Sequence, residues 1–147
     1  LFPMKIHKAY LLSLLFVVFA CTGDESRNNN PFLVDIAIQV DLNTNLPQFS
    51  NLNFDLNYVI VPNQGLRGFV VYRISSSQYV AYELSDPNHS PNDCSQMTIS
   101  GIEATCPCPD DLNKYNVITG QPIEGNGLYG LKAYRAIRNG AVVRVTN

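Results

Sequence analysis

Apolar and polar residues alternate along residues 32–42, which read FLVDIAIQVDL. Every even position of this segment is apolar, while Asp35, Gln39 and Asp41 occupy odd positions. Successive side chains of a β-strand point to opposite faces of a sheet, so this alternation places one face of a strand against a hydrophobic core. The pattern predicts a half-buried strand over the whole segment.

Seven further segments are typical of strands, because they contain β-branched and aromatic residues and are bounded by turn-forming residues. They cover residues 58–62, 68–74, 79–84, 96–100, 102–105, 131–136 and 141–145. The polar turn SSSQ predicts a hairpin over residues 68–84, and Asn-Gly predicts a hairpin turn at 138–141 because it tolerates positive φ. No segment sustains a helical period over three turns. The sequence therefore predicts an all-β domain, a small antiparallel sandwich or barrel.

The first twenty residues have the layout of a secretory signal peptide. Lys5 and Lys8 precede an uncharged run, residues 9–20, which is shorter than the about 20 residues that a membrane-spanning helix needs. The run ends in VFAC at residues 18–21, which resembles the bacterial lipobox. The resemblance implies that Cys21 becomes the mature N-terminus and carries acyl chains, so that membrane lipid is its partner. The alternative is a secreted protein with Cys21 in a disulfide.

The segment after Cys21, TGDESRNNNP, contains almost no apolar side chains and is predicted to be a flexible tether. We therefore expect a signal peptide at 1–20, a lipidated cysteine and tether at 21–31, and a folded domain at 32–147. The acidic pair at residues 24–25 resembles the short acidic tags that direct some Gram-negative lipoproteins to the cell surface. We expect an outer-membrane lipoprotein that faces the periplasm or the cell surface.

Composition and charge narrow the class of protein further. The chain has 147 residues, 46% apolar and 15% charged, which fits one globular domain and excludes a disordered or collagen-like chain. Without residues 1–20, eight basic and twelve acidic side chains remain, a formal charge of about −4. An acidic domain repels phosphate backbones, so we expect no nucleic-acid partner.

The order of motifs after residue 68 resembles that of Rieske-type iron–sulfur domains. A hairpin is followed by SDPNH, a second hairpin, ATCPCP at 104–109, KYNVITGQPIEG and a last hairpin. In Rieske domains two loops at one end of a small β-sandwich carry Cys-x-His and Cys-x-x-His. Residues Tyr115, Thr119, Gly120 and Pro122 also fit the pattern that follows the second loop. The resemblance covers residues 68–147 and implies a Rieske-like antiparallel β-sandwich.

The ligand positions depart from the Rieske pattern. A Rieske cluster is held by two thiolates on one iron and two imidazoles on the other. The resemblance places Asp86 and Asn88 at the ligand positions of the first loop, and Cys106 and Pro109 at those of the second. His89 replaces Asn88 as a ligand only if the loop shifts by one residue. We expect no cofactor; the alternative is a [2Fe–2S] electron carrier with atypical ligands.

The sequence Cys-Pro-Cys at 106–108 resembles a feature of the Rieske domains of respiratory and photosynthetic cytochrome complexes, in which an extra cysteine pairs with the first loop. The resemblance implies a disulfide between Cys94 and Cys108, while the residues alone leave a bond between Cys94 and Cys106 open. An exported protein folds in an oxidising compartment, where a bridge that closes about fifteen residues stabilises the fold by roughly 3 kcal/mol.

Two other kinds of chemistry are open to the same residues. A Cys106–His89 nucleophile would need an orienting group such as Asp86 and an oxyanion hole. A zinc ion accepts His89, Cys106 and a carboxylate from Asp86, Asp110 or Asp111, but no ligand spacing selects a metal site. We expect no enzyme activity, and a domain that acts by binding or structural support of an envelope protein complex.

Overall fold

The structure, a computed structural model, describes residues 30–147. The predicted signal peptide, the predicted lipidation site Cys21 and most of the predicted tether lie outside the described residues. These residues form ten strands and one short 3-10 helix: β1 (Gln39–Asn43), η1 (Pro47–Asn53), β2 (Asn57–Val61), β3 (Phe69–Ser75), β4 (Gln78–Glu83), β5 (Thr98–Ser100), β6 (Glu103–Thr105), β7 (Lys114–Asn116), β8 (Pro122–Glu124), β9 (Ala133–Asn139) and β10 (Val142–Thr146). Within this part of the chain no helix is long and apolar enough to span a membrane.

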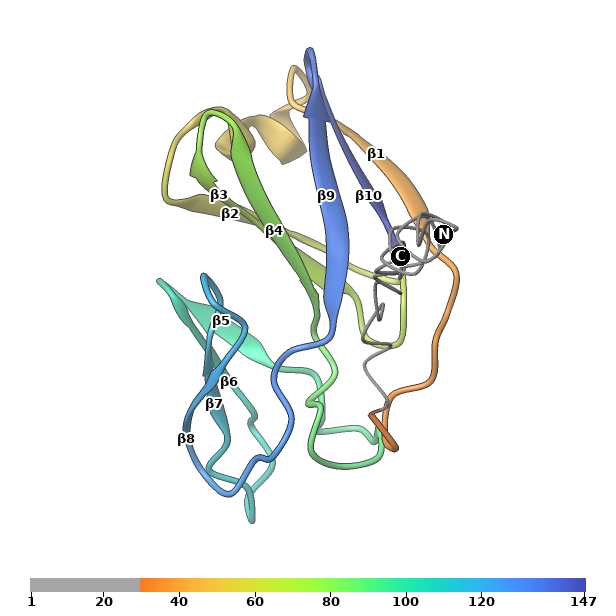
Figure 1. Cartoon of the computed structure of the whole chain (residues 1–147), viewed down its shortest axis with the longest axis vertical. Helices are drawn as coiled ribbons and strands as arrows, with labels where there is room; N and C mark the ends of the chain where they lie inside the picture. Colours follow the sequence, from red (N-terminus) through yellow and green to blue (C-terminus); the bar gives the residue numbers. More distant parts are fainter. Residues whose placement is uncertain (1–29) are drawn as a thin grey trace, which may run out of the picture.

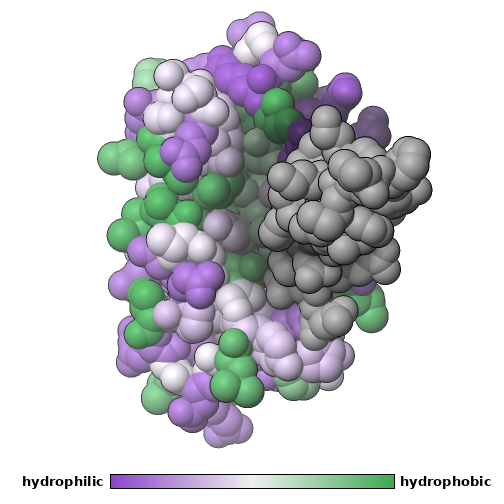
Figure 2. All heavy atoms as spheres, in the orientation of Figure 1, coloured by the Kyte–Doolittle hydropathy of each residue, from purple (hydrophilic) through white to green (hydrophobic). Residues whose placement is uncertain are grey.

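Two antiparallel sheets make up the fold (Figure 1). The larger sheet has the strand order β1-β10-β9-β4-β3-β2, and the smaller one has the order β5-β6-β7-β8. The all-β prediction is therefore confirmed. Figure 2 shows hydrophobic residues interspersed with hydrophilic ones over the described part of the visible face, rather than gathered in one patch.

Strand β3 is buried on both faces and belongs to both hydrophobic clusters of the domain. Phe69 and Val71 contribute to the first cluster, which contains residues of β1, β9 and β10. Val70 and Tyr72 contribute to the second cluster, which contains residues of β6 and β7. The larger sheet therefore curls around the first cluster, while the second holds the smaller sheet against the outer face of β3.

The strand predicted over residues 32–42 is present only as β1, so the prediction is wrong for its first seven residues. Leu33 is buried and Val34 is 66% exposed, the reverse of the predicted alternation. A local turn explains the difference, because the Asn30 side chain accepts hydrogen bonds from the backbone N–H groups of Phe32 and Leu33. Such side-chain bonds compete with a strand ladder.

The other predicted strands are present, with ends that differ by at most three residues. Three elements were not predicted: η1, β7 and β8. Strands β7 and β8 have three residues each, as do β5 and β6, so three-residue strands are predicted unevenly. The helix η1 begins at Pro47 and is shorter than the segments for which a helical period can be recognised.

Candidate functional site

Two loops meet at one end of the domain: residues 84–97, between β4 and β5, and residues 106–113, between β6 and β7. A disulfide between Cys94 and Cys108 joins them, with the two Cα atoms 5.1 Å apart. This is the pairing that the Rieske resemblance implies. Among the described residues Cys106 is the free cysteine, and it is buried.

Asp86 anchors the first loop through a fully buried carboxylate. Its Oδ1 accepts hydrogen bonds from the Asn88 backbone N–H at 2.7 Å and the Tyr115 hydroxyl at 2.9 Å. Its Oδ2 has a longer contact, 3.4 Å, with the Asn113 side-chain amide. Burial raises the pKa of Tyr115, so its hydroxyl stays protonated and donates. These donors offset the cost of placing a carboxylate in the interior.

Asn88 occupies a position where the resemblance expects a histidine ligand, yet its side chain holds another segment of the chain. Its Nδ2 donates to the Tyr115 hydroxyl at 2.7 Å and to the Tyr129 carbonyl at 2.9 Å. Its Oδ1 accepts from the backbone N–H groups of Leu128 and Tyr129, at 2.8 and 2.9 Å. Gly127 lies so close that a Cβ there would approach Asn88 Nδ2 to 2.6 Å. We call this arrangement the Asn88 clamp; it uses all four hydrogen bonds of the amide.

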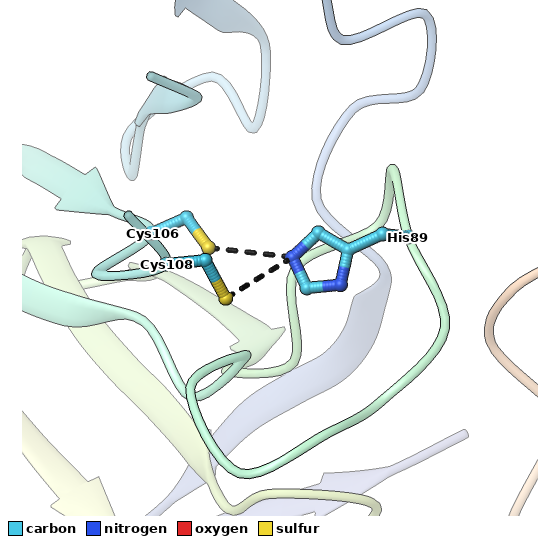
Figure 3. Close-up of side chains that lie close together, drawn as sticks. All are labelled: His89, Cys106 and Cys108. Atoms are coloured by element: carbon cyan, nitrogen blue, oxygen red, sulfur yellow. Dashed lines mark hydrogen bonds between the residues drawn. The ribbon is translucent and has the colours of Figure 1, made fainter. Parts of the chain in front are cut away.

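The His89 imidazole points at both cysteines of the Cys-Pro-Cys segment (Figure 3). Its Nε2 lies 3.4 Å from Cys106 Sγ, 3.8 Å from Cys108 Sγ and 3.2 Å from Asp111 Oδ2. Its Nδ1 lies 3.0 Å from the Ser90 carbonyl oxygen. Because a carbonyl only accepts, this contact is a hydrogen bond when Nδ1 carries a proton, which directs Nε2 toward sulfur and carboxylate.

The Cys106 thiol is enclosed, with 3% of the residue exposed. Burial raises the pKa of this thiol to about 12; the carboxylates of Asp86 and Asp111 add to the increase, and a backbone hydrogen bond at Cys108 opposes it. The thiolate is the nucleophilic form of cysteine. A neutral, enclosed thiol gives no support to a nucleophile formed by Cys106 and His89.

Four donor groups converge at this end of the domain. Asp86, His89, Cys106 and Asp111 each offer one ligand atom, and these atoms all lie within 4.8 Å of one another. We call them the four-donor group. The Asp111 backbone N–H donates to the Cys108 carbonyl at 3.1 Å. This turn brings Asp111 back toward the other three residues of the group. Asp110 and Pro109 are not members, and Asp110 lines a neighbouring groove of about 480 Å³.

The residues present do not fit a Rieske cluster, which needs two thiolates and two imidazoles on two irons. In the described part of the chain, Cys106 is the free thiol and His89 the imidazole, because Cys94 and Cys108 are joined. The four-donor group is also compact, since its ligand atoms all lie within 4.8 Å of one another. Such a set suits one ion better than two irons with bridging sulfides.

The two sheets, the two loops at one end and the disulfide between them match the arrangement that the resemblance predicts. The chain has a Rieske-like fold. No family model matches the sequence, and no curated protein matches it either. The chain is similar to a solved structure described as "Complex of reduced oxygenase and oxidized ferredoxin in carbazole 1,9a-dioxygenase", with a TM-score of 0.48 and 21% sequence identity, over 77% of this chain and 94% of that chain.

Proposed function

We propose that the protein is a lipid-anchored envelope lipoprotein whose Rieske-like domain works without a [2Fe–2S] cluster, as a binding or structural module and not as an enzyme. The observation that carries the proposal is the Asn88 clamp. A side chain at a ligand position has all four of its hydrogen bonds committed to protein atoms, so it serves the loops and has no lone pair left for iron.

The loop end suits a binding role because it is held rigidly and presents apolar side chains. The disulfide and the Asn88 clamp tie three segments together. Leu112 and Leu128 lie on two of these segments and are 71% and 88% exposed. Rigid loops that present leucines favour contact with an apolar surface of an envelope protein, because little conformational entropy is lost on binding.

The test of the cluster-free state uses the full chain, exported in a bacterium and purified in detergent. We expect a colourless protein with no stoichiometric iron or acid-labile sulfide, and with one disulfide after mapping by mass spectrometry. Broad visible absorption together with two irons and two sulfides per chain would contradict the proposal and support the alternative, an electron carrier with atypical ligands.

The test of the anchor compares the full chain with its Cys21→Ser variant in cell fractions. We expect the parent chain in the outer-membrane fraction and the variant out of it, because two or more acyl chains are needed for durable membrane attachment. Cys106→Ser is the matched control and should leave the membrane fraction unchanged. Equal fractionation of the parent and Cys21→Ser would contradict lipidation at Cys21.

A further inference from the structure

We propose that Asp86, His89, Cys106 and Asp111 bind a single divalent transition-metal ion of the zinc type. The two loops contribute equally to this site, since Asp86 and His89 come from the first and Cys106 and Asp111 from the second. A bound ion would therefore connect the loops at a second point, beside the disulfide between Cys94 and Cys108.

The spacing of the donors fits one tetrahedral ion. Zinc lies about 2.3 Å from sulfur and about 2.0–2.2 Å from nitrogen or oxygen, which separates neighbouring ligand atoms by roughly 3.3–3.6 Å. His89 Nε2 already lies 3.4 Å from Cys106 Sγ and 3.2 Å from Asp111 Oδ2. The other separations are at most 4.8 Å. Binding would require the donors to close by roughly one ångström.

Three of the four ligands are oriented by hydrogen bonds at the atom that would not bind metal. His89 places Nδ1 against the Ser90 carbonyl, so Nε2 faces the group. Asp111 Oδ1 accepts the Asn113 backbone N–H at 2.8 Å, which leaves Oδ2 toward the imidazole. Asp86 Oδ1 accepts from two donors, and its Oδ2 contacts the Asn113 amide at 3.4 Å. Outer contacts of this kind orient the ligands of metal sites.

The chemistry of the donors favours zinc over other common ions. A thiolate and an imidazole exclude magnesium and calcium, which take oxygen ligands, whereas zinc accepts sulfur, nitrogen and carboxylate oxygen. With the ion bound, two carboxylates, a thiolate and the divalent cation carry a net charge of −1. The ion thereby neutralises most of the charge of acceptors that otherwise face one another. Four protein ligands also leave no open position, which is typical of a structural site rather than a catalytic one.

Cobalt(II) is the probe for the experiment, because its visible bands report four-coordination and its near-ultraviolet charge-transfer band reports a thiolate ligand. The full chain with an intact disulfide is titrated with cobalt(II) and then with zinc(II). We expect one equivalent per chain, both spectral features, and displacement of cobalt by zinc. Binding of zinc should also raise the midpoint of thermal unfolding, since an ion that binds only the folded state stabilises it.

Variants separate this site from nonspecific binding. Asp111→Asn and His89→Gln should each lower the affinity for zinc at least tenfold. Cys106→Ser should do the same and also remove the charge-transfer band of bound cobalt. The matched control is Asp110→Asn, which removes a neighbouring carboxylate outside the group and should bind like the parent. Circular dichroism and disulfide mapping of every variant show that a loss of binding is not a loss of fold.

Four outcomes would overturn the inference: no binding below millimolar metal, a six-coordinate spectrum without the thiolate band, equal weakening by Asp110→Asn and Asp111→Asn, or binding that requires reductant. The last would mean that Cys108, freed from the disulfide, completes the site with His89 and Cys106. A colourless protein that binds no metal would overturn only this inference, whereas an iron–sulfur spectrum would overturn the proposed function.

Discussion

Single side chains decide what the loop end can do, and Asn88 is the clearest case. Its amide bonds the backbone of Leu128 and Tyr129, forty residues away along the chain. Asp86, at the preceding position where the resemblance expects a ligand, likewise accepts hydrogen bonds from the Asn88 backbone N–H and the Tyr115 hydroxyl. At two positions where the resemblance expects ligands, Asp86 and Asn88 therefore make hydrogen bonds that stabilise the loops.

Removal of the Asn88 clamp should destabilise the domain. We expect Asn88→Ala to lower the free energy of unfolding by about 2–3 kcal/mol, because partly buried backbone donors and the Tyr115 hydroxyl lose their partner. Urea unfolding followed by circular dichroism measures the change. Asn126→Ala, an exposed position on the same segment, is the control and should change stability by less than about 0.5 kcal/mol. A result for Asn88→Ala as small as that of the control would refute the clamp.

The protonation state of Cys106 can be tested by its reactivity in the metal-free protein. Because burial raises the pKa of the thiol to about 12, roughly one thiol in ten thousand is ionised at pH 8. We expect a disulfide reagent to modify native Cys106 at least a hundredfold more slowly than the denatured chain. The folded pKa exceeds the ordinary value of 9.0. Its contribution to stability is therefore complete below about pH 9 and is lost as the pH rises toward 12. Rapid native labelling at pH 8 would show a thiolate instead.

At the scale of elements, the edge strand β1 is joined to β10 by backbone hydrogen bonds and by one ion pair between their side chains. Asp41 lies directly opposite Arg144, and the guanidinium donates to both carboxylate oxygens at 2.7 Å. The hydrogen bond from Arg144 lowers the pKa of the Asp41 carboxyl. The pair is solvent-exposed, so its effect on stability is small.

We expect NMR titration to place the pKa of Asp41 below 3.8, and the variant Arg144→Gln to return it toward that value. Because the pKa of Asp41 is lower in the folded than in the unfolded protein, the pair stabilises the fold at pH values above the unfolded pKa. This stabilisation is lost as the pH falls through the folded pKa. Arg73→Gln, which removes a guanidinium that pairs with Asp55 and not with Asp41, is the matched control and should leave the Asp41 titration unchanged. An unchanged Asp41 titration in Arg144→Gln would show that the pair does not persist in solution.

The sequence predicted elements wherever the hydrophobic pattern spans five or more residues of one strand. Alternation predicted residues 39–42, which pair with β10, and it failed near Asn30, whose side chain forms a local turn. Strands β7 and β8 were not predicted, whereas β5 and β6, which are equally short, were, so strands of three residues are predicted unevenly. The place of β7 and β8 comes from pairing with β6 and with each other.

The candidate site was predicted only in part, for reasons of distance along the chain. The resemblance supplied the positions of Cys94, Cys106 and Cys108, and His89 was named as a one-residue shift. Nothing in the sequence separates Asp111 from Asp110, because the choice depends on how the turn after Cys108 closes. The Asn88 clamp could not be foreseen either, since its partners are set by tertiary folding.

At the scale of the whole molecule, the two sheets depend on different sources of stability. The larger sheet encloses the cluster that contains Leu42, Phe69 and Val143, all fully buried. The smaller sheet consists of four three-residue strands, and the disulfide closes its loops at the far end. Short strands give few ladder bonds, so the smaller sheet relies on the second hydrophobic cluster and on the Cys94–Cys108 bond.

Loss of the disulfide should therefore loosen one part of the domain before the rest. We expect the double variant Cys94→Ser/Cys108→Ser to lose roughly 3 kcal/mol of stability, because the unfolded chain regains the entropy of an open loop. Native-state hydrogen exchange should rise in β5–β8 and the two loops, while β3, β9 and β10 stay protected up to global unfolding. Cys106→Ser, compared with the parent in metal-free protein, is the control that keeps the bond and the protection pattern. Uniform acceleration across both sheets would mean that the domain opens as one cooperative unit, and that its stability is not divided between the sheets.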